Sequence, residues 1–305
     1  MKNKGFVLLS VIFSVTLLLT VAVAFAWFAR NQLQGAATED FAFRARCAAR
    51  EACEYAAKAV SDDKNGYDSI FERLYSPTGG IALELGGFKV RVKLRPLNDR
   101  ISLQGLFLPD GITVRTEYEE AWNSVWNEVE HPELAEVVLD FMDKDEQQRL
   151  GSTEKKEFLN RPLFDLSELK LLDGINDELL YGKNEKKGKK NKKKCLSQFI
   201  SVLGSDKINV NSANAETLAV LDASIGYGNA QSLVAARNTS PVEKLDDLKR
   251  YPGFSAAAVT KLTNVLSTES THFELLITVS EGKRERNYKA VIKRGEGCSL
   301  LRWEE

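Results

Sequence analysis

The stretch DFMDKDEQQRLGSTE, residues 140–154, contains the side chains best suited to binding a metal ion. Asp143, Asp145 and Glu154 stand at positions 1, 3 and 12 of a calcium loop of the EF-hand type. Gln147 offers a further oxygen at position 5, but Gln148 replaces the glycine expected at position 6. Calcium takes about six to eight oxygen ligands, which clustered carboxylates supply. The pattern predicts a calcium site, with a solvated acidic loop as the alternative.

Other metal and catalytic chemistry has little support in the sequence. The chain has two histidines, His131 and His272, and no cysteine pair with the CxxC spacing of zinc sites. Neither histidine lies in a recognisable nucleophile motif, so we expect no enzymatic activity. The four cysteines allow three disulfide pairings or free thiols, and the sequence does not choose between them: Cys47, Cys53, Cys195 and Cys298.

Residues 207–262 resemble tandem helix-hairpin-helix units, with INVNSANAETL before the first helices and YPGF at the second hairpin. In nucleic-acid-binding versions, backbone N–H groups of a glycine-rich hairpin contact phosphate. Acidic and basic residues cancel in this region, and the whole chain has a formal net charge of −1. The sequence therefore favours a role in helical packing or protein contact over binding of nucleic acid.

The elements that position these residues begin with an uncharged run from Phe6 to Phe28. As a helix this run spans about 35 Å, enough to cross a hydrocarbon core of roughly 30 Å. Lys2 and Lys4 precede it and predict a cytoplasmic N-terminus. A cleaved secretion signal is the alternative, because small residues near its end could form a cleavage site.

Residues 31–60 predict a continuation of this helix onto a globular body. Apolar side chains near helical spacing form the expected buried stripe: Phe41, Phe43, Cys47, Ala48, Cys53, Ala56, Ala57 and Val60. Residues 79–106 predict strands, because apolar and basic residues alternate over 89–94. Strands are also expected near 273–280, 286–294 and 298–303, and helical patterns fill the middle of the chain. The fold class is therefore α+β, with a helical domain inserted into an antiparallel sheet.

A low-complexity basic run, GKNEKKGKKNKKK, covers residues 182–194. Like charges at this density repel one another, so the run predicts a solvated loop. Contact with anionic phospholipid or an acidic partner is the alternative.

Several of these segments together resemble the K-type minor pseudopilin of the type II secretion system, the general secretion pathway protein K family. KGFVLL looks like a prepilin processing site, and VVLDFMDKDEQ, NRPLFDLSELKLLDGINDEL and LSQFISVLGSDKINVNSANAETL match successive family segments. FELLITV, YKAVIKR and LLRWEE match its closing strands. The resemblance implies a pilin-like long helix on an antiparallel sheet, with an inserted all-α domain of the helix-hairpin-helix or SAM-like kind.

The resemblance also implies a division of the chain. The expected parts are a leader peptide (1–5), a transmembrane segment (6–28), a pilin-like body (29–108), an inserted helical domain with the basic loop (109–270) and closing strands (271–305). It implies cleavage between Gly5 and Phe6 by a prepilin peptidase, and N-methylation of Phe6. Ser10 stands at the fifth mature position, where major pilins carry glutamate.

By the same resemblance, the protein assembles with I- and J-type minor pseudopilins and other pseudopilins at the pseudopilus tip. It is expected in the inner membrane, with a single span and its globular part in the periplasm. Calcium is the implied cofactor, with ligands Asp140, Asp143, Asp145 and Glu154 carried over by position. The competing hypothesis is a membrane-anchored helix-hairpin-helix DNA-binding protein of a competence or type IV pilus.

Overall fold

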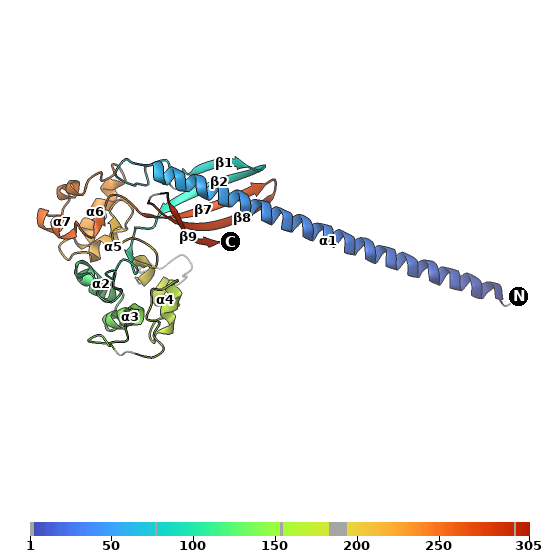
Figure 1. The fold of residues 1–305 in the computed structure, drawn as a ribbon, viewed down its shortest axis with the longest axis horizontal. Coiled ribbons are helices and arrows are strands. Elements are labelled where there is room, and N and C mark those ends of the chain that lie inside the picture. Colours follow the sequence, from blue (N-terminus) through green and yellow to red (C-terminus); the bar gives the residue numbers. More distant parts are fainter. Residues whose placement is uncertain (1–2, 77, 153–154, 183–193, 296) are drawn as a thin grey trace.

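The computed structural model describes residues 3–76, 78–152, 155–182, 194–295 and 297–305. A single long helix projects from a globular part that contains one main sheet and a group of short helices (Figure 1). Two separate hydrophobic cores hold this globular part together. The first joins the long helix to the sheet, and the second lies within the helical region.

Helix α1 runs without interruption from Asn3 to Asp62. Its described side chains are almost all exposed before Phe41, and beyond that point one face is buried against the sheet. The prediction of a continuous helix is confirmed, but the expected stripe was partly wrong, because Phe43 and Cys47 are exposed. Alanines form much of the contact instead, since their small side chains let the helix approach the strands closely: Ala45, Ala48, Ala49, Ala52 and Ala56.

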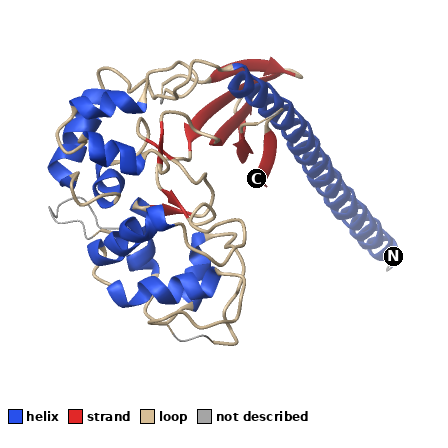
Figure 2. Ribbon diagram, turned by 60° about the vertical axis from the view of Figure 1, so that its left-hand side comes forward, coloured by secondary structure: helices blue, strands red, loops and turns tan. Residues whose placement is uncertain are grey.

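The main sheet is antiparallel and has the order β1-β2-β7-β8-β9. Its strands are β1 (Ile81–Leu85), β2 (Phe88–Pro96), β7 (His272–Glu281), β8 (Arg284–Lys293) and β9 (Ser299–Glu304). Buried and exposed residues alternate strictly along β2, as predicted for a half-buried strand. Strands β2 and β7 pair although the whole helical region separates them in the sequence. The inserted arrangement of the α+β fold is therefore present (Figure 2).

The helical region contains α-helices and short 3₁₀ helices around a core with two large aromatic side chains. Trp122 and Trp126 are fully buried, and their rings meet edge to face with centroids 5.6 Å apart. The α-helices are α2 (Thr116–Glu128), α3 (Ala135–Met142), α4 (Asp177–Tyr181), α5 (Ala215–Val220), α6 (Gly226–Arg237) and α7 (Ala256–Leu262). The 3₁₀ helices are η1 (Pro132–Leu134), η2 (Leu166–Leu171), η3 (Leu196–Gln198) and η4 (Leu245–Arg250).

Two short parallel ladders lie outside the main sheet, and one asparagine connects the helical region to that sheet. Strand β3 (Ile101–Ser102) pairs with β4 (Ile200–Ser201), and β5 (Ile208–Asn209) pairs with β6 (Leu266–Ser267). The side chain of Asn98 accepts from the backbone N–H groups of Thr271 and His272, both at 3.1 Å, and donates to the carbonyl of Lys207. These bonds tie the start and the end of the insertion to the same point of the sheet.

Candidate functional site

The first candidate functional feature is the bare half of helix α1. From Phe6 to Phe28 its large apolar side chains are exposed. The most apolar stretch of 18 residues in the helix has a mean hydropathy of 2.7, and no part of it is buried. The helix is long and apolar enough to cross a membrane by length and composition. Ser10 donates a hydrogen bond to the carbonyl of Phe6 at 3.0 Å, so its hydroxyl is satisfied within the helix. Processing between Gly5 and Phe6 stays a prediction.

The second feature is a pair of buried carboxylates at the end of helix α3. Asp140 lies in its last turn and Asp143 directly follows it, and both are almost fully buried. The backbone N–H of Arg149 donates to Asp140 Oδ1 at 3.0 Å, and Arg149 Nε donates to Asp143 Oδ2 at 2.7 Å. Arg149 therefore bonds Asp143 through its guanidinium and Asp140 through its backbone N–H.

The hydrogen bonding of this pair is incomplete. Asp140 Oδ2, Asp143 Oδ1 and Ser152 Oγ are buried and have no hydrogen-bond partner among the described residues. Burial raises the pKa of Asp143 to about 6, although Arg149 favours its charged form. A buried carboxylate oxygen without a partner is costly. A bound cation would satisfy such oxygens, so these donors fit calcium chemistry.

The structure brings together only part of the expected ligand set. Asp145 is half-buried, and its Oδ1 accepts from the backbone N–H of Gln147 at 3.0 Å. Among the described residues, the carboxylate oxygens of Asp140, Asp143 and Asp145 do not all lie within 4.8 Å of one another. Glu154 lies outside the described residues. Two carboxylates of the expected set, Asp140 and Asp143, are thus buried at the end of helix α3, and the full ligand set stays a prediction.

Arg149 is the residue of this site that sequence reasoning missed. Besides Asp143 it contacts the carbonyl of Ile112, and its guanidinium lies 5.8 Å from the centre of the Phe107 ring. It therefore links the acidic loop to the segment before helix α2. The available signal was that Arg149 is one of two basic residues in the acidic stretch 140–154.

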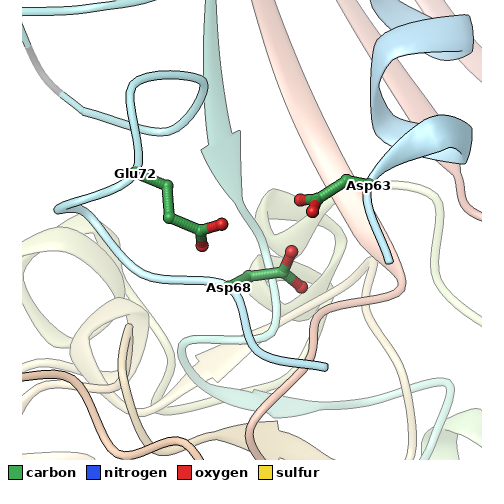
Figure 3. Close-up of side chains that lie close together, drawn as sticks. All are labelled: Asp63, Asp68 and Glu72. Atoms are coloured by element: carbon green, nitrogen blue, oxygen red, sulfur yellow. The ribbon is translucent and has the colours of Figure 1, made fainter. Parts of the chain in front are cut away.

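A second acidic cluster lies beyond the end of helix α1 (Figure 3). Carboxylate oxygens of Asp63, Asp68 and Glu72 all lie within 4.8 Å of one another. Arg294 forms a bidentate pair with buried Asp68, at 2.8 and 2.9 Å. Tyr75 donates to Asp63 at 2.7 Å. Internal donors thus occupy this cluster, which sequence reasoning did not identify.

The basic residues of the helix-hairpin-helix region are engaged inside the protein. Arg237 is buried and donates to the carbonyls of Val210 and Ala213. Lys261 pairs with Asp222 at 2.8 Å and also with Glu120. These contacts remove cations that a phosphate backbone would need, which agrees with the charge balance of the sequence.

The four cysteines are free thiols: Cys47 is exposed, Cys53 and Cys195 are buried, and Cys298 is half-buried. Burial raises the pKa of Cys53 to about 11, so this thiol is protonated at neutral pH. The structure therefore favours the free-thiol alternative over a disulfide framework.

Comparison with known proteins agrees with this geometry. The family described as "Type II secretion system (T2SS), protein K" matches residues 208–269, a minority of the chain that covers the helix-hairpin-helix region. A chain of the crystal structure of the GspK-GspI-GspJ complex from the enterotoxigenic Escherichia coli type 2 secretion system superposes with a TM-score of 0.61. The match covers 90% of this chain and 98% of that chain at 17% sequence identity.

The two proteins share a fold. The long helix, the antiparallel sheet and the inserted helices of the present chain thus form an arrangement already seen in a secretion-system complex. No curated protein matches this chain in sequence.

Proposed function

We propose that this protein is a K-type minor pseudopilin, a structural component of a type II secretion system without catalytic activity of its own. The observation that carries the proposal is the fold similarity over 90% of this chain, and the protein K family match to residues 208–269 supports it. The bare half of helix α1 suits both membrane anchoring before assembly and helix packing within a filament. The helical domain would then stand at the tip.

Assembly is the first test. The solved complex contains GspK with GspI and GspJ, so we expect this chain to bind the I- and J-type pseudopilins of its own system. The full chain with a C-terminal affinity tag, co-expressed with both, should co-purify them in stable proportion. Failure to recover either partner, with all three chains folded, would overturn the proposed partners.

The same preparation tests the DNA-binding alternative. Because the cations of residues 208–269 are balanced or internally paired, the full chain should not shift double-stranded DNA at physiological ionic strength. A salt-dependent gel shift would favour the pilus DNA-receptor hypothesis instead.

Processing of the N-terminus is the second test. We expect a prepilin peptidase to cleave between Gly5 and Phe6, leaving N-methylated Phe6 as the first residue, with the globular part in the periplasm. Mass spectrometry of the membrane-extracted protein should give this mass. A mature protein that begins at Met1 or after Ala26 would contradict the processing model.

Ser10 bears on the position of the subunit. An unpaired charge inside lipid is costly, and a glutamate at the fifth mature position would offer a carboxylate to the N-terminal amine of a neighbouring subunit. Ser10 satisfies its own hydroxyl on the carbonyl of Phe6 and offers no carboxylate. The first subunit of a filament would need no such carboxylate. If Ser10→Glu leaves assembly and tip position unchanged, the missing carboxylate does not define the cap.

We further propose that the acidic loop binds calcium through Asp140, Asp143, Asp145 and Glu154. The support is the pair of unpartnered buried oxygens on Asp140 and Asp143. When bound, the ion would neutralise the buried carboxylates and hold the loop against helix α3.

Calcium that binds only the folded state stabilises it by RT ln(1 + [L]/Kd), about 2.7 kcal/mol at one hundred times Kd. Millimolar calcium should therefore raise the melting temperature of the full chain relative to chelator. Asp143→Ala should abolish the difference. Asp173→Ala, which changes a fully exposed carboxylate outside the loop, should leave it intact. An equal melting temperature with calcium and with chelator would remove the claim.

A further inference from the structure

A cavity of about 720 Å³ lies where the helical region meets the sheet. The segment from Leu103 to Gly111 and the end of helix α3 line one side, and Gly204–Asp206 line another. Thr271, His272 and Lys293 contribute the sheet side. The volume is within the range of pockets that hold small ligands or terminal residues of a peptide. Neither the acidic loop's carboxylates nor the bare half of α1 contributes to its lining.

Positive charge predominates in this cavity. Arg115, Lys144 and Lys293 line it, against the single carboxylate of Asp206. Arg115 lies 3.5 Å from Asp206, and its Nε is buried without a hydrogen-bond partner among the described residues. In the same described part of the chain, neither Lys144 nor Lys293 forms an ion pair within 4.0 Å. Arg115, Lys144 and Lys293 could therefore donate hydrogen bonds to an additional anion.

The remaining lining is mostly apolar, with Leu103, Phe107, Met142 and Leu163 among its members. His272 adds no charge, because burial lowers its pKa to about 4 and the nearby Lys293 acts in the same direction. Apolar walls beside a few convergent cations suit a ligand that has an apolar body and one anionic end. A free phosphate or a divalent cation would leave the apolar walls unused.

We propose that this cavity binds a carboxylate carried on an apolar body, as in the apolar C-terminal residue of a polypeptide. Arg115 would hold the carboxylate with its planar fork, and Lys144 and Lys293 would add charge at the rim. The apolar side chain would lie against Leu103 and Phe107. This site is separate from the assembly role proposed above, so either proposal can fail without the other.

The direct test measures binding to the full chain, in a nonionic detergent and with chelator present. The probe is a fluorescent peptide ending in Leu-Phe with a free carboxylate, compared with the same peptide as a C-terminal amide. Charge-assisted hydrogen bonds predict at least about tenfold weaker binding of the amide. Equal affinity of the two peptides, or no binding of the carboxylate form, would overturn the proposal.

Octanoate distinguishes the two sources of this chemistry. If octanoate displaces the peptide and octanamide does not, a free fatty acid suffices as ligand. If neither displaces it while the peptide carboxylate still binds, the ligand is a polypeptide C-terminus. Both results support the carboxylate site. Displacement by octanamide as well as octanoate would contradict it, because the carboxylate would then contribute nothing.

Substitutions separate recognition from misfolding. Lys293→Gln and Lys144→Gln should each weaken peptide binding several-fold, whereas Lys249→Gln, an exposed lysine outside the cavity, should have no effect. Asp206→Asn should strengthen binding several-fold, because it removes the carboxylate that competes for Arg115. A gain of affinity cannot come from loss of folding. Weaker binding by Asp206→Asn with unchanged binding by both lysine variants would refute the assignment.

Discussion

The two acidic clusters of this protein differ in how fully their carboxylate oxygens are hydrogen-bonded. Asp63, Asp68 and Glu72 have carboxylate oxygens within 4.8 Å of one another, and Arg294 and Tyr75 supply them with internal donors (Figure 3). Asp68 in particular receives both arms of the Arg294 guanidinium and the backbone N–H of Ser270. The cluster is an ion-pair network that fixes the end of helix α1 to strand β8.

The pair Asp140 and Asp143 has fewer carboxylates, and its hydrogen bonding is less complete. Arg149 reaches one oxygen of Asp143 with its side chain and one of Asp140 with its backbone, and the other oxygen of each carboxylate is left buried and unpartnered. The difference between the clusters is thus the number of unsatisfied acceptors rather than the number of carboxylates. Unsatisfied acceptors mark the position where an added cation gains most.

Removal of Arg294 should produce the largest effect. Arg294→Met leaves Asp68 charged, buried and without its guanidinium, and breaking such a buried pair costs about 3–5 kcal/mol of unfolding free energy. Urea denaturation of the full chain in detergent, followed by tryptophan fluorescence, measures this loss. Arg302→Met, which removes a half-buried arginine on β9 whose ion pairs lie near the surface, should cost no more than about 1 kcal/mol.

Calcium tests the interpretation of that first cluster. If the Arg294→Met variant regained its full stability on addition of millimolar calcium, Asp63, Asp68 and Glu72 would be a metal site that the arginine merely blocks. We expect no such rescue, because Tyr75 and Ser69 still hold Asp63 and Glu72.

Removal of Arg149 should cost less stability than removal of Arg294, and it should strengthen calcium binding. Without calcium, Arg149→Met leaves Asp143 buried and unpaired, which should cost about 2–3 kcal/mol of unfolding free energy. The same change frees Asp143 Oδ2 for the metal, so calorimetry should show tighter calcium binding. Arg149→Lys keeps the charge but loses the planar fork, and should give an intermediate affinity. Weaker calcium binding by Arg149→Met would show that Arg149 supports the site instead of competing for it.

The fold was largely predictable because its signals are local. Alternation over residues 89–94 reports a half-buried strand whatever its partner, and the uncharged run after Gly5 reports a helix that needs lipid or other helices. Asn214 caps α5 through Thr217 N, as its place before Ala215 predicts. The buried face of α1 was harder to predict, since alanines carry no strong hydrophobic signal and their role depends on how closely the sheet approaches.

The site was only partly predictable because its contacts depend on how the chain folds back, which spacing alone does not report. Asp68 and Arg294 are 226 residues apart in the sequence, and they meet only because the segment after helix α1 packs beside the end of strand β8. Asn98 lies in a turn after β2, and its side chain ties the insertion to the sheet through residues far away in the sequence. Spacing located Asp143 in a candidate calcium loop, but it could not show that Arg149 folds back onto that carboxylate.

His272 extends the comparison to a buried base. Its imidazole is buried with the hydroxyl of Thr271 at 2.8 Å from Nδ1, and burial lowers its pKa from 6.5 to about 4. The folded state therefore binds this proton less readily than the unfolded state. The stability that neutral His272 permits is complete above about pH 6.5 and is lost as the pH falls toward 4.

The size of this loss follows from the shift, and it should not exceed about 3 kcal/mol between pH 7 and pH 4. Carboxylates titrate in the same range, so the measured quantity is the difference between the wild type and His272→Asn, which keeps a polar atom near Thr271 but cannot titrate. That difference should shrink at low pH. NMR titration gives an independent value, with His131 as the second histidine signal. A titration midpoint of His272 near 6.5 would contradict this prediction. It would show that the imidazole is open to water through the cavity beside it.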